Sequence, residues 1–293
     1  VDAREGCARA LSVAMNDVRW GIIGCGDVTE VKSGPALAKA DGSALVAVMR
    51  RTAALAEDYA RRHAVGTWYS DAEALVRDPN VDAVYVATPP ASHHAYVRLA
   101  ARHGKPVYVE KPMAMNHREC LDMVAACRQA GVPLFTAYYR RALPRFLRVK
   151  ALVDEGAIGE VRAVSIVLTR RVIGGDGPLP WRVDPAVAGG GLFVDLASHT
   201  LDLLDYVMGP IAAVAGGASN QAGAYAAEDL VAGAFAFESG ARGTGLWSFA
   251  ADRDADRVEI LGSAGRVVFS TFDEQPVVLE VAGRAETFDE PHP

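Results

Sequence analysis

The sequence contains little cysteine and no cysteine motif. The four cysteines among its 293 residues form no CxxC pair; they are Cys7, Cys25, Cys120 and Cys127. Such sparse thiols exclude a disulfide-dense secreted scaffold and the cysteine pairs of a structural zinc site. Reduced thiols in a cytoplasmic protein are the simplest interpretation.

Long apolar runs and blocks of like charge are also missing. No apolar run is long enough to cross a bilayer, and the net charge of −6 is spread along the chain. We therefore expect neither a membrane nor a nucleic acid as a partner. The remaining composition, 51% apolar and 23% charged, is that of an ordinary globular protein, and a length of 293 residues predicts two domains.

The first residues lack a targeting signal. The segment VDAREGCARALSVA is mildly amphipathic, but its apolar core is too short and interrupted for a secretory signal. Because Met15 precedes a segment that becomes a strand at once, residues 1–14 are interpreted as a non-native or disordered extension. A genuine N-terminal arm is the alternative. The chain ends just after a strand-like segment, which leaves truncation open.

Short apolar runs alternate with helix-like segments in the first half. Buried strands are predicted at Arg19–Ile23, Ala44–Met49, Ala83–Ala87, Val107–Glu110 and Leu134–Tyr138. Helices are predicted between them at Pro35–Ala40, Thr52–His63, Ser92–His103 and Asn116–Ala130. Thr52 is expected to cap one helix, and Gly131 to end another. This alternation predicts an α/β fold, a doubly wound parallel sheet (a Rossmann domain) over residues 15–139.

The alternation of apolar runs and helix-like segments ends after residue 139. Helices are predicted at Pro144–Glu155 and Gly191–Met208, and a strand at the Val- and Ile-rich run Glu160–Val172. Two hairpin signatures follow, in which Val231–Phe237 pairs with Ala241–Phe249, and Val258–Leu261 pairs with Arg266–Ser270. Residues 140–293 are therefore predicted to form an α+β domain with a mostly antiparallel, open-faced sheet and helices on one face.

A glycine turn follows the first predicted strand. Gly24 allows the tight turn, and Gly26 lets the backbone approach a pyrophosphate; Asp27 and Val28 then open a helix whose N-terminus favours an anion. The third small position holds Thr29, so this dinucleotide fingerprint is degenerate, and a bare GxG is often only a tight turn. The strand–helix context favours a nicotinamide dinucleotide, with Cys25 packed beneath it.

The end of the second strand distinguishes the two nicotinamide dinucleotides. An NAD site usually has an Asp or Glu there for the ribose 2′-hydroxyl. This sequence has Arg50 and Arg51 instead, and a guanidinium suits a 2′-phosphate. NADP is therefore preferred over NAD. The alternative is that both arginines are solvated residues at a helix start.

Three sequence blocks carry a resemblance to a known family. They are GIIGCGDVTE, then ATPPASHH with HGKPVYVEKPMAMN, and finally PWRVDPAVAGGGLFVDLASHTLDLLD. With these blocks the chain resembles the Gfo/Idh/MocA oxidoreductases from Val18 to about Gly265. The resemblance implies a Rossmann domain followed by a sheet domain, and hydride transfer between a nicotinamide and a carbinol carbon of a sugar, polyol or related compound. It also implies homodimers or homotetramers formed through the C-terminal sheet.

The resemblance also assigns functional positions. It implies a loop beside the nicotinamide, an EKP motif with a catalytic lysine, and an aspartate and a histidine of a GGxxxDxxxH block. These are Thr88, Pro89 and His93, then Glu110 and Lys111, and finally Asp195 and His199.

The chemistry of these residues fits that assignment. Lys111 follows a strand at the carboxyl edge of the sheet, where ligands bind in such folds. Asp195, His199 and Asp202 are spaced to share one helix face, so Asp195 is expected to orient or charge the imidazole. We assign proton exchange to His199 and the substrate hydroxyl to Lys111, with the reverse assignment open; Asp202 is interpreted as structural. A zinc site on this face is the rival, but no further ligand cluster is evident, so no metal is predicted.

Side chains flanking the predicted cleft are candidates for substrate binding. Tyr138 and Arg141 follow the last Rossmann strand, beside Tyr139 and Arg140, and Trp181 and Arg182 precede a glycine run. Aromatic faces and guanidinium groups suit a polyhydroxylated or carboxylated small molecule. Packing at a domain junction is the alternative for the tyrosines and the tryptophan.

The function favoured by the sequence is an NADP-preferring oxidoreductase acting on a sugar, polyol or cyclic diol. One alternative is a dihydrodiol- or biliverdin-type enzyme on the same scaffold. Another is a non-catalytic, cofactor-binding regulator, which intact Lys111, Asp195 and His199 argue against.

Overall fold

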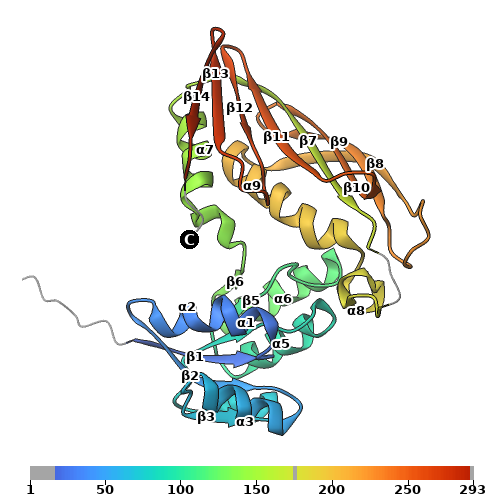
Figure 1. The fold of residues 1–293 in the computed structure, drawn as a ribbon. Helices are drawn as coiled ribbons and strands as arrows, with labels where there is room; N and C mark the ends of the chain where they lie inside the picture. Colours follow the sequence, from blue (N-terminus) through green and yellow to red (C-terminus); the bar gives the residue numbers. More distant parts are fainter. Residues whose placement is uncertain (1–16, 174–176, 291–293) are drawn as a thin grey trace, which may run out of the picture.

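The computed structural model describes residues 17–173 and 177–290, and its chain forms two sheets with a helical layer between them (Figure 1). The interpretation of residues 1–14 and Met15 lies outside the described residues. Within the described part of the chain, no helix combines the length and the hydropathy needed to cross a membrane.

The first sheet has six parallel strands in the order β3-β2-β1-β4-β5-β6. The strands are β1 (Val18–Ile23), β2 (Ser43–Met49), β3 (Thr67–Tyr69), β4 (Ala83–Val86), β5 (Val107–Val109) and β6 (Leu134–Thr136). This order is that of a doubly wound dinucleotide fold, whose ligands bind beyond the carboxyl ends of the strands where the order reverses. That point lies between β1 and β4.

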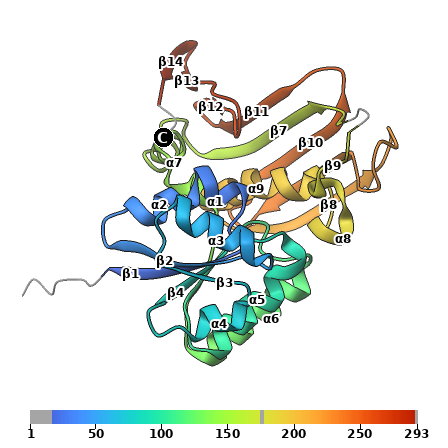
Figure 2. The ribbon, with the colours of Figure 1, turned by 60° about the horizontal axis from the view of Figure 1, so that its bottom comes forward.

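Helices cover both faces of the parallel sheet. Figure 2 shows α1 (Asp27–Val31), α2 (Ser33–Lys39) and α3 (Ala53–Arg62) on one side, and α4 (Ala72–Arg77), α5 (His93–Arg102) and α6 (His117–Ala130) on the other. The sheet is therefore buried between two layers, which is why its strands are continuous apolar runs rather than alternating ones. All four residues of β4, for example, are buried. The predicted parallel sheet is confirmed.

Local signals set several helix ends. The Asn116 side chain accepts a hydrogen bond from the backbone N–H of Glu119 at 3.0 Å, and Gly131 ends α6 with a φ of +68°. Thr52 occupies the N-cap position of α3 as expected, but its side chain makes no capping hydrogen bond. The short elements β3 and α4 were not predicted from the sequence. Strand β3 is too short to show an alternating pattern, and helix α4 is shorter than two turns, so neither has a detectable hydrophobic period.

The second sheet has eight strands in the order β14-β13-β12-β11-β7-β10-β9-β8. They are β7 (Val161–Arg171), β8 (Ile211–Ser219), β9 (Leu230–Phe237), β10 (Arg242–Ala251), β11 (Ala255–Gly262), β12 (Gly265–Phe269), β13 (Val277–Val281) and β14 (Arg284–Phe288). Neighbouring strands are antiparallel except for β7 and β10. The mostly antiparallel sheet is thus confirmed, including both hairpins.

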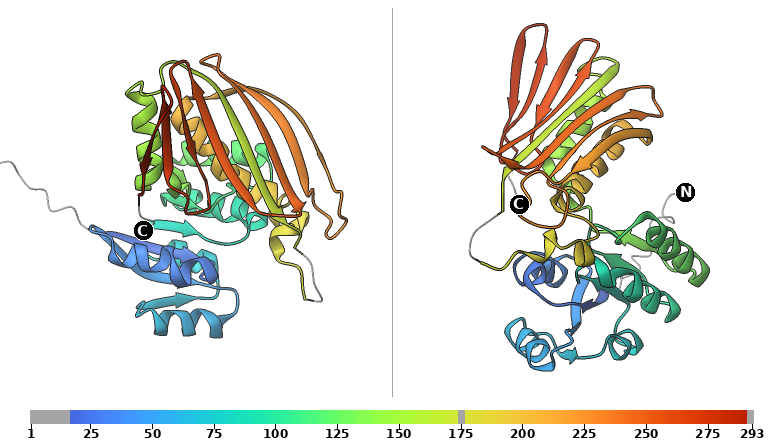
Figure 3. Two further views of the ribbon diagram at one scale, coloured as in Figure 1. Left: turned by 45° about the horizontal axis from the view of Figure 1, so that its top comes forward. Right: turned by 90° about the vertical axis from the view of Figure 1, so that its right-hand side faces the viewer.

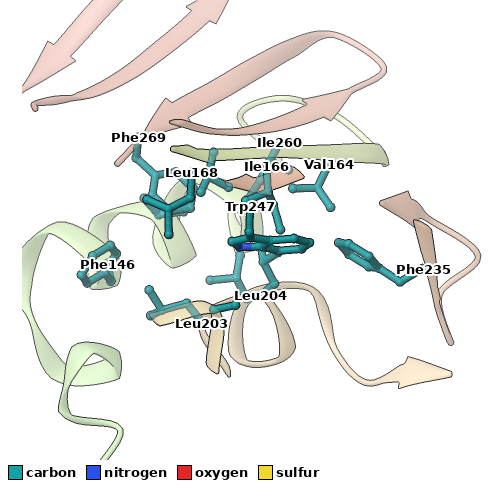
Figure 4. Packing of buried hydrophobic residues seen from close by; sticks show 14 of the residues in the cluster. Phe146, Val164, Ile166, Leu168, Leu203, Leu204, Phe235, Trp247, Ile260 and Phe269 are labelled. Carbon is teal, nitrogen blue, oxygen red and sulfur yellow. The ribbon is translucent and has the colours of Figure 1, made fainter. Parts of the chain in front are cut away.

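The helices of the described residues pack on one face of this sheet. In Figure 3, α7 (Pro144–Asp154) and α9 (Ser198–Met208) lie against the inner face, and none of the described helices covers the outer face. The short helix α8 (Pro185–Ala188) lies near the parallel-sheet half of the chain. The residues of β10 alternate between buried and exposed, as expected for a sheet covered on one side. Trp247 of β10, only 3% exposed, packs over Leu203 and Leu204 of α9 (Figure 4). This core holds α9 against the sheet and thereby fixes the helix that carries His199.

Candidate active site

A cleft of about 610 Å³ opens at the carboxyl ends of the parallel strands. Its walls come from both halves of the chain: the glycine turn and the ends of β2, β4 and β5 on one side, and the layer under the second sheet on the other. The lining includes Gly24, Gly26, Asp27, Val28, Lys32, Arg50, Arg51, Thr88, Pro89, Glu110, Lys111, Tyr139, Arg140, Trp181, Arg182, Asp195, His199 and Phe272.

Gly24 and Gly26 are glycines for different physical reasons. Gly24 has a φ of +93°, and a Cβ there would lie 2.4 Å from Cγ2 of Thr88, so the protein's own packing requires glycine. Gly26 has an extended backbone, and its Cβ would meet no protein atom closer than 3.9 Å, the carbonyl oxygen of Gly24. The space that a Cβ would fill at Gly26 therefore belongs to the cleft. A dinucleotide pyrophosphate fits this cradle, because such a glycine permits its close approach.

Thr29 explains how the third small position tolerates a larger residue. Its side chain is fully buried, and its hydroxyl donates to the Gly26 carbonyl at 2.7 Å while accepting from the Gly26 N–H at 2.9 Å. These two hydrogen bonds stabilise the backbone of the turn at Gly26. The fingerprint is degenerate in sequence, but the turn itself is intact.

The two arginines lie where the sequence placed them, at the end of β2 beside the turn. Arg50 is half-buried and donates from Nη1 to the carbonyl oxygen of Cys25 at 3.4 Å, whereas Arg51 is exposed. Both line the cleft next to the glycines, so guanidinium groups stand at the strand end where an NAD site carries a carboxylate.

An ion pair joins the two halves of the cleft. Nζ of Lys111, just beyond β5, donates to Oδ1 of Asp195 at 2.6 Å and to the Asp195 carbonyl oxygen at 3.3 Å. Both side chains are largely buried, at 16% and 12% exposed. The other carboxylate oxygen of Asp195 lies 3.4 Å from Nε of Arg182, whose guanidinium stacks on Trp181. Asp195 therefore holds two cations of the cleft in place.

His199 lies beside this pair but is not bonded to it. Its ring is 4% exposed, and its Nδ1 is buried without a hydrogen-bond partner in the described chain, which leaves Nε2 facing the cleft. Burial lowers the pKa of His199 to about 2, and the positive charges of Lys111, Arg140 and Lys32 act in the same direction. The imidazole is therefore neutral at physiological pH.

The expected pairing of Asp195 with His199 is wrong for a geometric reason. Asp195 lies in a π-helical turn, Phe193–Ala197, and α9 begins only at Ser198. A π turn holds more residues than an α turn, so the spacing of four no longer places the two side chains over one another. The carboxylate points to Lys111 instead.

Three residues proposed from the sequence lie outside the cleft lining. His93 is fully buried, and burial lowers its pKa; its Nε2 donates to the Thr88 carbonyl at 2.6 Å, and its Nδ1 lies 3.1 Å from the Pro112 carbonyl. His93 therefore connects the two loops that carry Thr88 and Lys111, and its role is structural.

The other two follow β6. Arg141 donates from Nε to Asp202 at 2.8 Å, an arrangement that also explains Asp202 as a structural residue. Tyr138 packs edge-on behind the His199 ring, with ring centroids 6.0 Å apart. Their neighbours Tyr139 and Arg140 line the cleft in their place.

Lys32 and Phe272 line the cleft but were not singled out from the sequence. Lys32 lies at the junction of α1 and α2, and Phe272 follows β12, 240 residues later in the chain. No motif marks Phe272, and only the fold brings it to the site. In the described part of the chain, no three His, Cys, Asp or Glu residues gather as a metal site.

The comparisons with known proteins agree with this geometry. Residues 18–138 match the model of an oxidoreductase family with an NAD-binding Rossmann fold, and residues 146–268 match the Gfo/Idh/MocA C-terminal domain. The chain belongs to the Gfo/Idh/MocA family of NAD(P)-dependent oxidoreductases.

Individual relatives are similar over much of their length. Oxidoreductase P35 of Formosa agariphila is 39% identical over 94% of this chain and 86% of its own. A 1,5-anhydro-D-fructose reductase of Ensifer adhaerens is 34% identical over 76% of this chain and 66% of its own. A levoglucosan dehydrogenase solved with NADH and levoglucosan has a TM-score of 0.83 at 25% identity, over 93% of this chain and 79% of that one.

The contrast between the two glycines gives a first prediction. Gly26→Ala should leave the free energy of unfolding within about 0.5 kcal/mol of the parent, because its Cβ meets open space. It should weaken NADPH binding at least about tenfold, since the methyl group occupies the phosphate cradle. Gly24→Ala should lose more than about 1 kcal/mol of stability as well. Urea unfolding and a fluorescence titration measure both; NADPH affinity unchanged in Gly26→Ala would place the pyrophosphate elsewhere.

Proposed function

We propose that this chain is an NADP(H)-preferring oxidoreductase that transfers a hydride between the nicotinamide and a carbinol or carbonyl carbon of a sugar, polyol or related cyclic compound. The observation that carries the proposal is the Lys111–Asp195 ion pair, which stands in the same cleft as the phosphate cradle at Gly26. The substrates named for the anhydrofructose reductase and the levoglucosan dehydrogenase support a sugar-like substrate here.

The hydride comes from or goes to the nicotinamide when it is bound, so the chain itself must hold the substrate and move one proton. Lys111 is placed for that proton. An ammonium group has three N–H donors, and Asp195 accepts two of them, one at Oδ1 and one at its carbonyl oxygen. The third N–H has no partner in the described chain. During reduction it donates its proton to the carbonyl oxygen; during oxidation the neutral amine takes the hydroxyl proton.

His199 takes the complementary role. A base whose pKa is about 2 is a poor proton acceptor, because efficient proton exchange needs a pKa near the working pH. A neutral imidazole can still hydrogen-bond the substrate hydroxyl through Nε2 and fix its direction. We therefore reverse the assignment made from the sequence: Lys111 exchanges the proton, and His199 positions the hydroxyl.

Preference for NADP rests on the end of β2. Arg50 and Arg51 flank the cradle, where they can pair with a 2′-phosphate. We further propose that residues 15–139 bind the dinucleotide, that residues 140–293 bind the substrate, and that Trp181 and Arg182 meet its hydroxyl groups.

Self-association through the second sheet is part of the proposal. The outer face of β8, β9 and β10 presents small or apolar side chains, among them Ala232, Ala234 and Leu246, the last of them 40% exposed. No helix of the described chain covers this face (Figure 3). A sheet face that no described helix covers suits a second copy of the chain, because a two-fold contact would bury this face on both copies.

The proposed function predicts which substitution stops turnover. With NADPH or NADP and a panel of sugars and polyols, Lys111→Met should lower kcat about 10²- to 10⁴-fold while NADPH still binds. His199→Gln should lose less, because it removes a positioning group, and Lys39→Met at the end of α2 serves as the surface control. A larger loss in His199→Gln than in Lys111→Met would overturn the proton assignment, and a parent protein inactive on the whole panel would overturn the function.

Cofactor preference has its own test. Arg50→Asp should weaken NADPH binding by about tenfold or more and leave NADH nearly unaffected, because only NADPH carries the 2′-phosphate. Arg77→Asp, whose guanidinium belongs to α4 and not to the cleft, is the matched control. Tighter binding of NADH than NADPH by the parent chain, or an unchanged NADPH affinity in Arg50→Asp, would refute the preference.

A further inference from the structure

Within the described residues, two cations that line the cleft away from the phosphate cradle have no ion-pair partner. Lys111 and Arg182 share Asp195, and Arg50 and Arg51 stand at the phosphate cradle. Arg140 and Lys32 remain, and in the described chain neither has a carboxylate within 4 Å of its charged nitrogens. A cleft that keeps two unpaired cations, at least one of them buried, favours an anion as its occupant.

Arg140 is the buried member of this pair. It is 9% exposed, Nη1 donates to the Thr271 carbonyl at 2.6 Å, and Nε is buried with no hydrogen-bond partner. Nη2 is therefore the nitrogen that is both unbonded and open to the cleft. A buried guanidinium remains charged, and leaving it without a counter-charge is costly.

The buried carboxylate of Asp256 forms no ion pair with Arg140. Asp256 acts on Arg140 through space, but its oxygens accept the backbone N–H groups of Thr271, Phe272 and Asp273. It thereby shapes the loop that carries Phe272, and its cationic contact is with Arg170, at 3.9 Å. We therefore expect the counter-ion of Arg140 to be a group of a molecule that binds in the cleft.

Two aromatic rings contact both Arg140 and His199, and so place the charge of Arg140 near the proposed catalytic residues. The Arg140 guanidinium lies 5.5 Å from the ring centre of Tyr139 and 4.8 Å from that of Phe272. The same two rings meet the His199 imidazole edge-on, each with centroids 5.9 Å apart. Arg140 and His199 therefore flank one aromatic pair, so a molecule whose hydroxyl meets His199 also brings its neighbouring substituents to Arg140.

We propose that Arg140, assisted by Lys32, forms a carboxylate subsite, and that the substrate of this enzyme is a sugar acid rather than a neutral sugar. The proposal rests on the proposed function, because it places the substrate hydroxyl at Lys111 and His199. A carboxylate matches the accessible N–H edge of a guanidinium, and burial between two rings strengthens the bond by excluding water.

The test compares acids with their neutral parents. The NADP-loaded chain is assayed with D-glucuronate and D-galacturonate against D-glucose and D-galactose, and binding of each is also measured by calorimetry. The parent chain should prefer the acids at least about tenfold in kcat/KM, or in affinity where turnover is slow. Arg140→Met should reduce that acid-to-neutral ratio about tenfold or more, and Arg140→Lys should restore part of it.

Controls separate the subsite from folding and from cofactor binding. Arg141→Met removes the adjacent arginine, which is paired with Asp202 outside the cleft, and should keep the parent ratio. Lys32→Met should lower the ratio less than Arg140→Met, and it keeps the test open if Arg140→Met does not fold. An Arg140→Met variant that loses NADPH affinity in place of acid preference would assign Arg140 to the cofactor and overturn the proposal.

Failure of the subsite and of the function remain distinguishable. Lys111-dependent turnover of neutral sugars with no preference for acids, in kinetics and in calorimetry, overturns the subsite alone. Absence of turnover and of binding for every sugar, acid or neutral, overturns both.

Discussion

The ion pair between Lys111 and Asp195 is the contact on which the site depends. Lys111 follows strand β5 of the parallel sheet, and Asp195 lies in the π turn that opens α9 under the second sheet. Their 2.6 Å bond therefore fixes one half of the chain against the other. Because both groups are largely buried, removing Asp195 would leave the charge of Lys111 without its partner, which is strongly destabilising, whereas removing Lys111 would still leave Asp195 beside Arg182. The same bond leaves one lysine N–H facing the cleft.

The cations around the Lys111–Asp195 pair differ in their neighbours. Asp195 holds Lys111 and Arg182, and the glycine turn stands beside Arg50 and Arg51. Burial lowers the pKa of His199 and so keeps its imidazole neutral, and the positive charges of Lys111, Arg140 and Lys32 act in the same direction. In the proposed function, Lys111 exchanges the proton and His199 positions the hydroxyl, which reverses the assignment that the sequence favoured.

The sequence predicts the parts of this molecule that depend on local patterns. Apolar runs ending in turn residues predict the parallel sheet, and Gly24, Lys111 and Asp195 are found because motifs mark them. What it could not predict depends on backbone rotation and on long-range contacts. The π turn directs Asp195 away from His199, against the helical spacing. Whether Arg140 or Arg141 faces the cleft is decided by a single 3₁₀ turn, Tyr139–Ala142, and Phe272 arrives from the second sheet with no local signal at all.

The protonation state of His199 tests the central claim most directly, because the account assigns the moving proton to Lys111. Two-dimensional ¹H–¹⁵N spectra of histidine-labelled protein, with the His199 signals identified by their loss in His199→Gln, report the charge of its ring. Since burial lowers the pKa of His199 to about 2, the ring should remain neutral from pH 8 down to pH 5. An imidazolium at His199 near neutral pH, titrating close to the ordinary histidine value, would contradict the assignment.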